Sequence, residues 1–551
     1  MNILSVNFGV HDAAACVLVD GEIKSYYKEE RLTGIKRDTE PKLAIKQCLD
    51  DFGGNIDYAT IISYPTSSTK QHQLIQKFTG IRPANIIEYS YHHHLSHAAL
   101  AFYNSGFDES LVIVIDGQGT LYSDNLAEGE TVYLAKYPCD FQCVIKNVSA
   151  NKAHSHLSGA VPLDKYLIKH ENYECNINPG EGGIVNVYNT ATVLMSQSVL
   201  ENGKTMGLSS YGEKSDYPSF FNDKSQPDWS LFTDTQSSIR LYQSHEDKVI
   251  KEITEENYKF YADYAYEVQT QTQDAVVNLI QREIEKTGCK NVCMVGGYAM
   301  NIVANHYYTQ QFPDVQFYFE PNADDGGLPI GAAKHFHHER KNDFTKRPIT
   351  TTAFHGREYD VSSYKSKTTS IAEIARLLYQ NNSVAVYRGL AEAGQRALGN
   401  RSIFFNPLHP NAKEIVNRIK KREWYRPFAG IVLEEDVDLF FDMGNIQSSP
   451  YMTISFPVKT NLIPGITHID GTCRIQTTSK EDGYLYELIS EFKKLSGVGI
   501  ILNTSFNLAG EPLVETPEDA IKTLKNSDLD YLWFEKTNQL YSNKKSKVLY
   551  G

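Results

Sequence analysis

Histidine and aspartate residues form the first candidate for chemistry in this sequence. His93 and His97 lie four residues apart in the run HHHLSHAALAFYNSGF, which has a helical pattern, so both imidazoles emerge on one face. Asp116 follows a buried apolar run, and Asp325 lies in the glycine-rich segment DGGLPIGAA. A lone HxxxH pair is usually structural, but two imidazoles with two carboxylates suit a divalent first-row metal such as iron, manganese or zinc.

The first glycine-flanked turn of the chain offers a group for proton transfer. His11 and Asp12 are adjacent in FGVHDAAA, and an imidazole titrates close to neutral pH. We therefore interpret His11 as a candidate general base and Asp12 as the carboxylate that orients it. The alternative is that Asp12 caps the turn and His11 is merely exposed.

A glycine pair provides a candidate anion site. Gly296 and Gly297 follow the apolar run NVCMV and precede the helical pattern YAMNIVANHYY. A strand, a glycine pair and a helix amino terminus together let backbone N–H groups approach a phosphate or another anion.

Basic residues gather in one stretch of the second half of the chain. From Arg388 to Arg426 there are nine basic residues against three acidic ones, and such a cluster usually binds phosphate. Part of the stretch, 411–422, also fits a solvated helix face. The motif RALGNRS, in which Arg396 and Arg401 bracket a glycine turn, is harder to explain in that way.

Polar residues next to predicted strands lie further along. Arg474 is part of HIDGTCRIQTT, and LNTSFNLAGEP contains Asn503, Thr504 and Ser505. Hydroxyl and amide groups in such positions suit a ribose, a phosphate or a small polar acyl group.

Short apolar runs separated by glycine turns must position these groups. Residues 3–8 and 15–19, followed by an Asp-Gly turn and the run EIKSYY, predict a β-meander at the start of the chain. A similar unit recurs at 111–115 and 131–137, which indicates an internally duplicated α/β domain. Two related halves whose turns face a nucleotide cleft are typical of the actin-like fold.

A second α/β domain is predicted for the rest of the chain. An amphipathic helix over 261–286 and a strand at 291–295 belong to the first domain, and the apolar pattern lapses near residue 350. Beyond that point helical and strand patterns alternate, at 371–380, 383–387, 411–422, 498–502 and 517–525. We therefore predict one domain over 1–350 and another over 351–551.

Composition narrows the class of protein. With 551 residues, 41% of them hydrophobic, the chain can form two or three cores. A net charge of −13 has the wrong sign for a protein that mainly binds nucleic acid or anionic lipid. No apolar run approaches the roughly 20 residues of a membrane span, and the first residues lack signal-peptide features. We expect a cytoplasmic protein with reduced cysteines, without a nucleic-acid or membrane partner.

Eight motifs, in order, resemble the O-carbamoyltransferase family of antibiotic tailoring and Nod-factor decoration. They are FGVHDAAACVLVDGEI, HHLSHAALAFYNSGF, GKTMGLSSYG, VGGYAMNIVAN, GLAEAGQRALGNRSI, KKREWYRPFA, HIDGTCRIQTT and LNTSFNLAGEP. The resemblance runs from about residue 1 to 530. It departs from the family pattern at RPFAG, where the family has RPFAP, and at Thr120, where the family has an acidic residue.

The resemblance implies a fold and a two-step reaction. It implies an actin-like amino-terminal domain, similar to the metal-binding enzyme of tRNA threonylcarbamoylation, followed by a YrdC-like α/β domain. The second domain would form carbamoyl-adenylate from carbamoyl phosphate and ATP, with Mg²⁺ accompanying the nucleotide. The first would then pass the carbamoyl group to a hydroxyl of a small natural product, as in antibiotic biosynthesis and secondary metabolism.

The resemblance also implies roles for individual residues. His93, His97, Asp116 and Asp325 become the ligands of an iron-type metal, and His11, with Asp12, becomes the base. The residues expected to bind cofactors are Gly296, Gly297, Asn301, Arg396, Arg401, Lys420, Arg426, Arg474, Asn503, Thr504 and Ser505.

Three alternatives share parts of this pattern. A sugar kinase of the actin-like class would explain the first domain but needs no RALGNRS motif. A threonylcarbamoyl transferase acting on tRNA would explain both chemistries, but the charge of −13 argues against a tRNA partner. A non-catalytic nucleotide or carbamoyl sensor would keep the pockets without needing His11 as a base. The sequence leaves the acceptor and the oligomeric state open.

Overall fold

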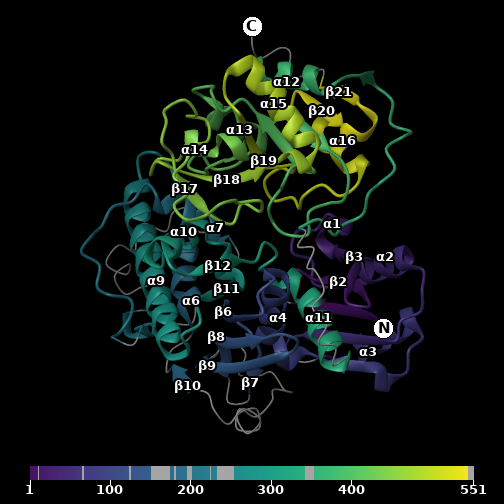
Figure 1. Ribbon diagram of the computed structural model, residues 1–551, viewed down its shortest axis with the longest axis vertical. Helices are drawn as coiled ribbons and strands as arrows, with labels where there is room; N and C mark the ends of the chain where they lie inside the picture. The colour runs from purple at the N-terminus through teal and green to yellow at the C-terminus, as the bar shows by residue number, and fades with distance from the viewer. Residues whose placement is uncertain are drawn as a thin grey trace. The chain divides into compact units, whose positions relative to one another are not determined.

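Two units make up the fold in the computed structural model, and a segment from near the amino terminus belongs to the second (Figure 1). The first contains Met1–Glu29 and Arg37–Thr351, and the second contains Glu30–Lys36 and Thr352–Gly551. The structure describes residues 1–9, 11–64, 67–122, 126–150, 174–178, 182–194, 201–223, 225–231, 253–341 and 353–543. The boundary expected near residue 350 lies outside the described residues.

A five-stranded sheet opens the first unit. Its strands are β1 (Asn2–Phe8), β2 (Ala14–Val19), β3 (Glu22–Lys28), β4 (Tyr58–Ser63) and β5 (Ile86–Glu88). They lie in the order β3-β2-β1-β4-β5. Strand β2 is antiparallel to both β1 and β3, whereas β4 is parallel to β1 and β5 is parallel to β4. Asp20 and Gly21 both have positive φ between β2 and β3, so the predicted Asp-Gly hairpin is confirmed.

A second sheet in this unit repeats the first. Its strands are β6 (Glu109–Ile115), β7 (Leu121–Tyr122), β8 (Leu126–Lys136), β9 (Asp140–Ala150), β10 (Glu174–Asn178), β11 (Asn291–Val295) and β12 (Gln316–Phe319). Its order β9-β8-β6-β11-β12 matches β3-β2-β1-β4-β5, with the same strand directions. This repeat confirms the internal duplication and the actin-like class of the first domain.

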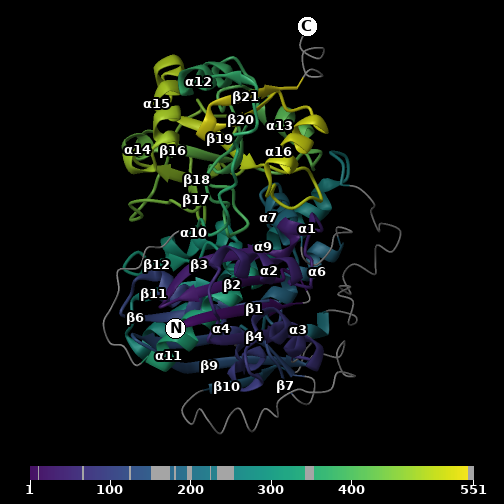
Figure 2. The same cartoon turned by 90° about the vertical axis from the view of Figure 1, so that its right-hand side faces the viewer.

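Helices pack around the two sheets (Figures 1 and 2). They are α1 (Glu29–Thr33), α2 (Lys42–Phe52), α3 (Thr69–Thr79), α4 (His93–Ser105), α6 (Ile184–Leu194), α7 (Asn202–Ser209), α9 (Tyr258–Thr287), α10 (Ile302–Gln311) and α11 (Leu328–Lys341). The predicted long helix is α9, which ends at Gly288 with φ 72°. Helices α4 and α11 lie side by side, and a side chain at Gly331 of α11 would collide with the Ser96 carbonyl.

A nine-stranded mixed sheet forms the second unit. Its strands are β13 (Lys367–Thr368), β14 (Val384–Tyr387), β15 (Arg401–Phe405), β16 (Ala429–Leu433), β17 (Ser455–Pro457), β18 (Thr472–Thr478), β19 (Ile500–Ser505), β20 (Tyr531–Phe534) and β21 (Gln539–Ser542). They lie in the order β13-β21-β20-β14-β15-β19-β16-β18-β17. Strand β19 extends beyond the predicted 498–502, because Asn503 and Ser505 pair with β15 and Asn503 also pairs with β16.

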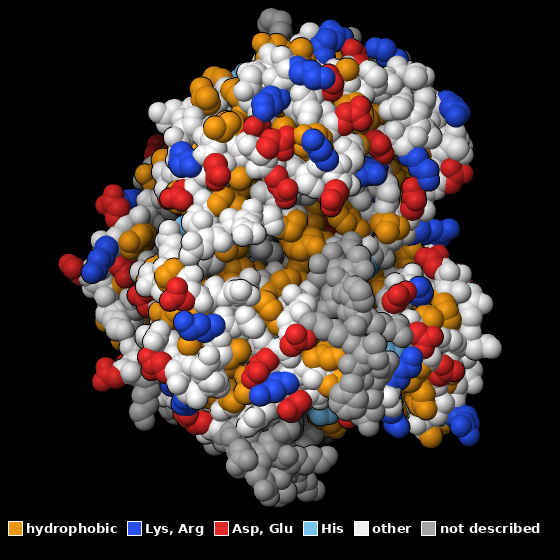
Figure 3. All heavy atoms as spheres, in the orientation of Figure 1, with side chains coloured by type: hydrophobic (Ala, Val, Ile, Leu, Met, Phe, Trp, Pro, Cys, Tyr) orange, Lys and Arg blue, Asp and Glu red, His pale blue; other side chains and the backbone are white. Residues whose placement is uncertain are grey.

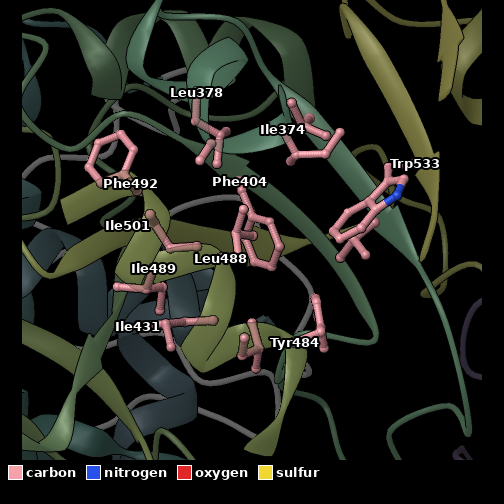
Figure 4. Packing of buried hydrophobic residues seen from close by; sticks show 14 of the residues in the cluster. Ile374, Leu378, Phe404, Ile431, Tyr484, Leu488, Ile489, Phe492, Ile501 and Trp533 are labelled. Carbon is pink, nitrogen blue, oxygen red and sulfur yellow. The ribbon is translucent and has the colours of Figure 1, made fainter. Parts of the chain in front are cut away.

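Helices cover this sheet and bury a hydrophobic core. They are α12 (Ile371–Tyr379), α13 (Ala412–Lys420), α14 (Val437–Phe440), α15 (Tyr484–Ser496) and α16 (Pro517–Lys525). Figure 4 shows Leu378 of α12 and Leu488 of α15 facing Phe404, Ile431 and Ile501 of the sheet. The α/β class predicted for the second domain is confirmed.

The surface carries both signs of charge. Figure 3 shows Lys and Arg side chains interspersed with Asp and Glu on the face in view. Among the described residues, no helix is both long and apolar enough to cross a membrane.

Candidate functional site

The four residues predicted to bind a metal come together in the first unit. One ligand atom from each of His93, His97, Asp116 and Asp325 lies within 4.8 Å of the others, and all four residues are buried. Asp325 Oδ1 is 3.4 Å from Nε2 of both His93 and His97. Those two Nε2 atoms have no hydrogen-bond partner among the described residues. Unpartnered imidazole nitrogens facing buried carboxylates fit a cation, so this quartet is a possible metal site.

The electrostatics of the quartet also favour a cation. Burial alone would lower the pKa of His93, but the carboxylates of Asp325 and Asp116 raise it to about 10. Burial and Asp325 would raise the pKa of Asp116, but the two histidines lower it to about 2. The carboxylates therefore favour positive charge at this point, which a proton or a divalent cation can supply.

Three parts of the chain position the four side chains of the quartet. His93 and His97 lie in the first turns of α4, Asp116 directly follows β6, and Asp325 precedes α11. Asp116 Oδ1 accepts a hydrogen bond from Gly297 N (2.8 Å). The Gly296–Gly297 turn predicted to hold an anion thus holds a carboxylate of the chain itself. Gly296 has φ 89°, and a side chain there would collide with the Ile115 backbone.

Residues from the first sheet fix the loop that carries Asp325, and the sequence reasoning missed them. Lys28 Nζ forms a buried ion pair with Asp324 (2.7 Å). Tyr26 donates to the Gly326 carbonyl (2.9 Å), and Asn7 donates to the Asp325 carbonyl (3.1 Å). The only signal in the sequence was that Lys28 follows a predicted strand, and this does not identify Asp324 as its partner.

His11 faces the quartet and contacts Asp12 as predicted. The distance from His11 Nδ1 to Asp12 Oδ2 is 2.8 Å, and that from His11 Nε2 to Asp325 Oδ2 is 4.0 Å. Burial would lower the pKa of His11, but Asp12, Asp325 and Asp116 raise it to about 9. Asp12 adopts φ 55°, which turns its carboxylate toward the preceding ring. The pair is therefore set to hold or move a proton beside the quartet.

A buried ion pair supports the Asp116 loop and also escaped the sequence reasoning. Glu128 of β8 pairs with Lys146 of β9, and both side chains are at most 1% exposed. Glu128 also accepts hydrogen bonds from Thr120 N (2.8 Å) and Tyr122 (2.9 Å). Thr120 thus occupies the position at which the family has an acidic residue, and its backbone N–H donates to the acidic residue Glu128 of β8.

Asn301 is engaged in local structure. Its side-chain oxygen caps α10 by accepting from Ala304 N (3.1 Å), and its Nδ2 donates to Gln269 (3.0 Å). Its predicted part in cofactor binding stays a prediction.

Four guanidinium groups influence one another in the second unit: Arg396, Arg422, Arg426 and Arg474. Burial, followed by Arg474 and Arg426, lowers the pKa of Arg396. Burial likewise lowers the pKa of Arg474 to about 10. Arg426 lies 3.8 Å from Glu423, and Arg422 is anchored on Asn417 (2.6 Å) and the Pro427 carbonyl (3.0 Å). All four residues are half-buried, and such a concentration of positive charge favours binding of an anion.

The loop that carries Arg396 is held from several sides. Glu392 Oε1 accepts hydrogen bonds from Leu398 N (2.8 Å), Asn400 N (3.0 Å) and Arg401 N (3.2 Å). Arg31, from the amino-terminal segment, donates to the carbonyls of Glu392 and Gly394, each at 2.9 Å. The sequence reasoning missed both Glu392 and Arg31.

Two predicted pocket residues have structural partners. Arg401 is fully buried, lies 3.7 Å from the Tyr387 ring centre and donates to backbone carbonyls that include Asn400 (3.1 Å). Lys420 Nζ lies 2.9 Å from both the carbonyl and Oδ1 of Asn507 and 3.0 Å from Ser505 Oγ. Both side chains are thus engaged in shaping the loops around the four arginines.

The remaining predicted residues lie on β19. Asn503 donates to the Ala397 carbonyl (2.8 Å), which ties β19 to the Arg396 loop. Ser505 donates to Asn507 Oδ1 (2.7 Å). Thr504, between Asn503 and Ser505 in the sequence, is buried.

The fold therefore combines an actin-like unit, which contains the quartet, with a second α/β unit that contains the arginine cluster. The family comparison makes this class specific. Residues 69–334 match the family described as "Carbamoyltransferase N-terminus", and residues 375–539 match the family described as "Carbamoyltransferase C-terminus". Together they cover more than half of the chain, which therefore belongs to the carbamoyltransferase family.

Relatives of the chain include nodulation proteins. It is 29% identical to Nodulation protein NolNO of Sinorhizobium fredii, covering 96% of this chain and 78% of the relative. It is 28% identical to Nodulation protein NolO of Bradyrhizobium diazoefficiens, covering 80% and 77%. Among solved structures, full-length HypF in its phosphate- and nucleotide-bound form has 13% identity and a TM-score of 0.38, covering 62% of this chain and 56% of HypF.

Proposed function

We propose that the protein is an ATP-dependent O-carbamoyltransferase that works in two steps. The second unit forms carbamoyl-adenylate from carbamoyl phosphate and ATP, and the first unit transfers the carbamoyl group to a hydroxyl of a small molecule. The observation that carries this proposal is the presence of two chemically different groups of residues in a carbamoyltransferase: a cation-type quartet and a cluster of half-buried guanidinium groups.

In the first step, positive charge does most of the work. Arg396, Arg426 and Arg474 neutralise the phosphate and carbamate charges while a carbamate oxygen attacks the α-phosphorus of ATP. Water first hydrolyses carbamoyl phosphate to carbamate and phosphate. The carbamate oxygen then forms its bond to the α-phosphorus as pyrophosphate leaves ATP, which enters with Mg²⁺. Thr504 and Ser505 supply hydroxyl groups near the nucleotide. The fixed Arg396 loop supports this role, since a preorganised donor costs no rearrangement during the reaction.

In the second step, the residues of the first unit bind the carbamoyl group and accept a proton. A divalent metal, with iron the first choice and manganese or zinc possible, would be held by His93, His97, Asp116 and Asp325 and would supply Lewis acidity. His11 Nε2 takes the proton from the acceptor hydroxyl, and Asp12 keeps the ring oriented through Nδ1. The acceptor oxygen forms its bond to the carbamoyl carbon, and AMP leaves carbamoyl-adenylate. The carboxylates of Asp12, Asp325 and Asp116 favour protonated His11, and a cation held by the quartet would offset their charge and leave the imidazole able to accept a proton.

The acceptor is a hydroxylated small molecule. The nodulation relatives and the resemblance to antibiotic-tailoring enzymes support a natural product of secondary metabolism. We propose a cytoplasmic enzyme for which nucleic acid and membranes are not substrates. A tRNA threonylcarbamoyl-type transferase and a non-catalytic sensor are the alternatives that experiment must separate.

A mass-shift assay tests the proposal. The protein is incubated with ATP, Mg²⁺, carbamoyl phosphate and a panel of hydroxylated metabolites, and a gain of one carbamoyl group on an acceptor is measured. We expect the gain to require both ATP and carbamoyl phosphate. A phosphorylated product would favour a sugar kinase, whereas nucleotide binding without any product from a broad panel would favour the sensor.

A further inference from the structure

Two buried amides in the second unit have carbonyl oxygens without partners. Gln476 Oε1 and Asn503 Oδ1 are the two amide oxygens that are buried without a hydrogen-bond partner among the described residues of this unit. The residues are 6% and 1% exposed, respectively. A buried acceptor left unpaired is costly, so its presence calls for an explanation.

Hydrogen bonding fixes the direction in which these amides point. Gln476 Nε2 donates to the Leu398 carbonyl (3.0 Å), and Asn503 Nδ2 donates to the Ala397 carbonyl (2.8 Å) and lies 3.8 Å from Met452 Sδ. Both amides thus hold consecutive carbonyls of the loop that carries Arg396. Turning either amide over would place two carbonyl oxygens against each other, so the free oxygens must point away from those carbonyls.

A free donor lies on the same face of the sheet. Asn503 and Arg474 both pair with Ala429, on opposite sides of β16, so their side chains share a face. Gln476 lies two residues after Arg474 on β18 and therefore shares that face as well. Arg474 Nε is buried without a hydrogen-bond partner among the described residues. This face thus offers two acceptors and a charged donor, next to the four guanidinium groups.

We propose that Gln476 and Asn503 recognise the amino group of the carbamoyl donor. A carbamoyl group carries two N–H donors and one carbonyl acceptor, which match the two free amide oxygens and the Arg474 guanidinium. The phosphate of the same molecule is neutralised by the neighbouring arginines. This inference rests on the proposed function, and it makes these two amides the specificity determinants that select a carbamoyl over an acyl group without N–H.

Acetyl phosphate is the appropriate probe, because it replaces the amino group with a methyl group of similar size. With the wild-type full-length protein, binding of carbamoyl phosphate, acetyl phosphate and inorganic phosphate is measured by calorimetry, and pyrophosphate release from ATP is measured with each acyl phosphate. Leaving one buried acceptor unpaired should cost roughly tenfold, so we expect a preference of about a hundredfold for carbamoyl phosphate.

Substitution of each amide separates its contribution. Gln476→Met keeps the length of the side chain but removes its carbonyl, and Asn503→Leu does the same at the other position. Each should reduce the preference for carbamoyl over acetyl phosphate by about tenfold, mainly by weakening the use of carbamoyl phosphate. Each substitution also removes a hydrogen bond to the Arg396 loop, which should weaken the binding of carbamoyl phosphate, acetyl phosphate and inorganic phosphate to the same extent. The ratio between the two acyl phosphates therefore isolates the contribution of the amide oxygen.

Gln539→Met is the matched control. Gln539 is a buried glutamine of the same unit whose oxygen accepts from Ser366 N (2.7 Å) and whose Nε2 donates to the Thr537 carbonyl (3.1 Å). Neither the oxygen nor the nitrogen of its amide is hydrogen-bonded to the Arg396 loop in these two contacts. Its replacement is expected to lower stability and to leave the preference between the two acyl phosphates unchanged.

The outcomes distinguish this inference from the proposed function. Equal use of acetyl and carbamoyl phosphate by the wild type would overturn the inference while leaving adenylate formation in place. A preference that survives both substitutions would also overturn it. Absence of any ATP-dependent reaction with carbamoyl phosphate would instead remove the proposed function, and the inference with it. The wild-type comparison decides the question even if a variant fails to fold.

Discussion

The two candidate sites balance their charges in different ways. In the first unit, imidazoles face carboxylates, and protonation of His93 and His11 compensates the acidic residues. In the second, guanidinium groups face one another, and burial lowers the pKa of Arg396, Arg422 and Arg474. A cation in the quartet would therefore replace the positive charge of a proton, whereas the arginine cluster would gain its compensating charge only from an anion.

Removing a ligand of the quartet should have the largest effect. His97→Ala leaves three ligands, and we expect loss of the bound metal and of carbamoyl transfer, with pyrophosphate release within about twofold of the wild type. Elemental analysis and the two half-reactions measure these quantities. His72→Ala is the control, because His72 belongs to the same unit but is 34% exposed and contacts Glu88 instead. Full metal occupancy in the His97 variant would refute the ligand assignment.

Removing the proposed base should have the next largest effect. His11→Ala is expected to retain the metal and carbamoyl-adenylate synthesis but to lose transfer by about 100-fold, the usual scale of general base catalysis. Asp12→Asn should cost less, because an amide can still contact His11 Nδ1. Carbamoylation of the acceptor at near wild-type speed by the His11 variant would leave this residue a structural role only.

Substitution of the two arginines of the RALGNRS motif should have different effects, one on catalysis and the other on stability. Arg396→Ala removes one of the converging guanidinium groups, and we expect a roughly tenfold to hundredfold slower release of pyrophosphate with an unchanged melting temperature. Arg401→Ala leaves the carbonyls that it binds without a buried donor, so it should mainly lower the melting temperature. Equal kinetic and thermal effects in the two variants would contradict the distinct roles that we propose for them.

Sequence reasoning brought the four residues of the quartet together because each of them had a local signal. His93 and His97 have the spacing of one helical face. Asp116 and Asp325 belong to short motifs that follow strands β6 and β12 of the second sheet. It missed Lys28, because its partner Asp324 is distant in the chain and no local pattern links a strand-end lysine to that aspartate.

The arginine cluster shows the opposite limit of sequence reasoning. A cluster of basic residues predicts an anion site, but charge alone does not distinguish a side chain that faces a ligand from one that holds a loop. Arg401 and Lys420 have the residue types expected of phosphate binders, yet backbone carbonyls and side-chain oxygens of the protein surround them. Gln476 was missed for a related reason, since a neutral amide in a strand carries no signal until its free oxygen is located.

The smallest expected effect concerns Arg31, which holds the Arg396 loop from the amino-terminal segment. Arg31→Ala removes two hydrogen bonds to the carbonyls of Glu392 and Gly394. Each is expected to contribute about 1 kcal/mol, so the loop should open more often, and pyrophosphate release should slow by roughly tenfold or less. Hydrogen exchange should rise at the amides of Leu398, Asn400 and Arg401, which Glu392 now protects.

Arg376→Ala provides the comparison for this last prediction. Arg376 belongs to the same unit and also makes two hydrogen bonds, but to Glu373 on the surface, where its side chain is 52% exposed. Its loss should change neither exchange in the loop nor pyrophosphate release. Arg31→Lys should fall between, because an ammonium cannot reproduce the two-pronged geometry of the guanidinium. If exchange at the three amides stays at the wild-type rate in Arg31→Ala, then Glu392 and β19 suffice to hold the loop, and the fixed position of Arg396 owes nothing to the amino-terminal segment.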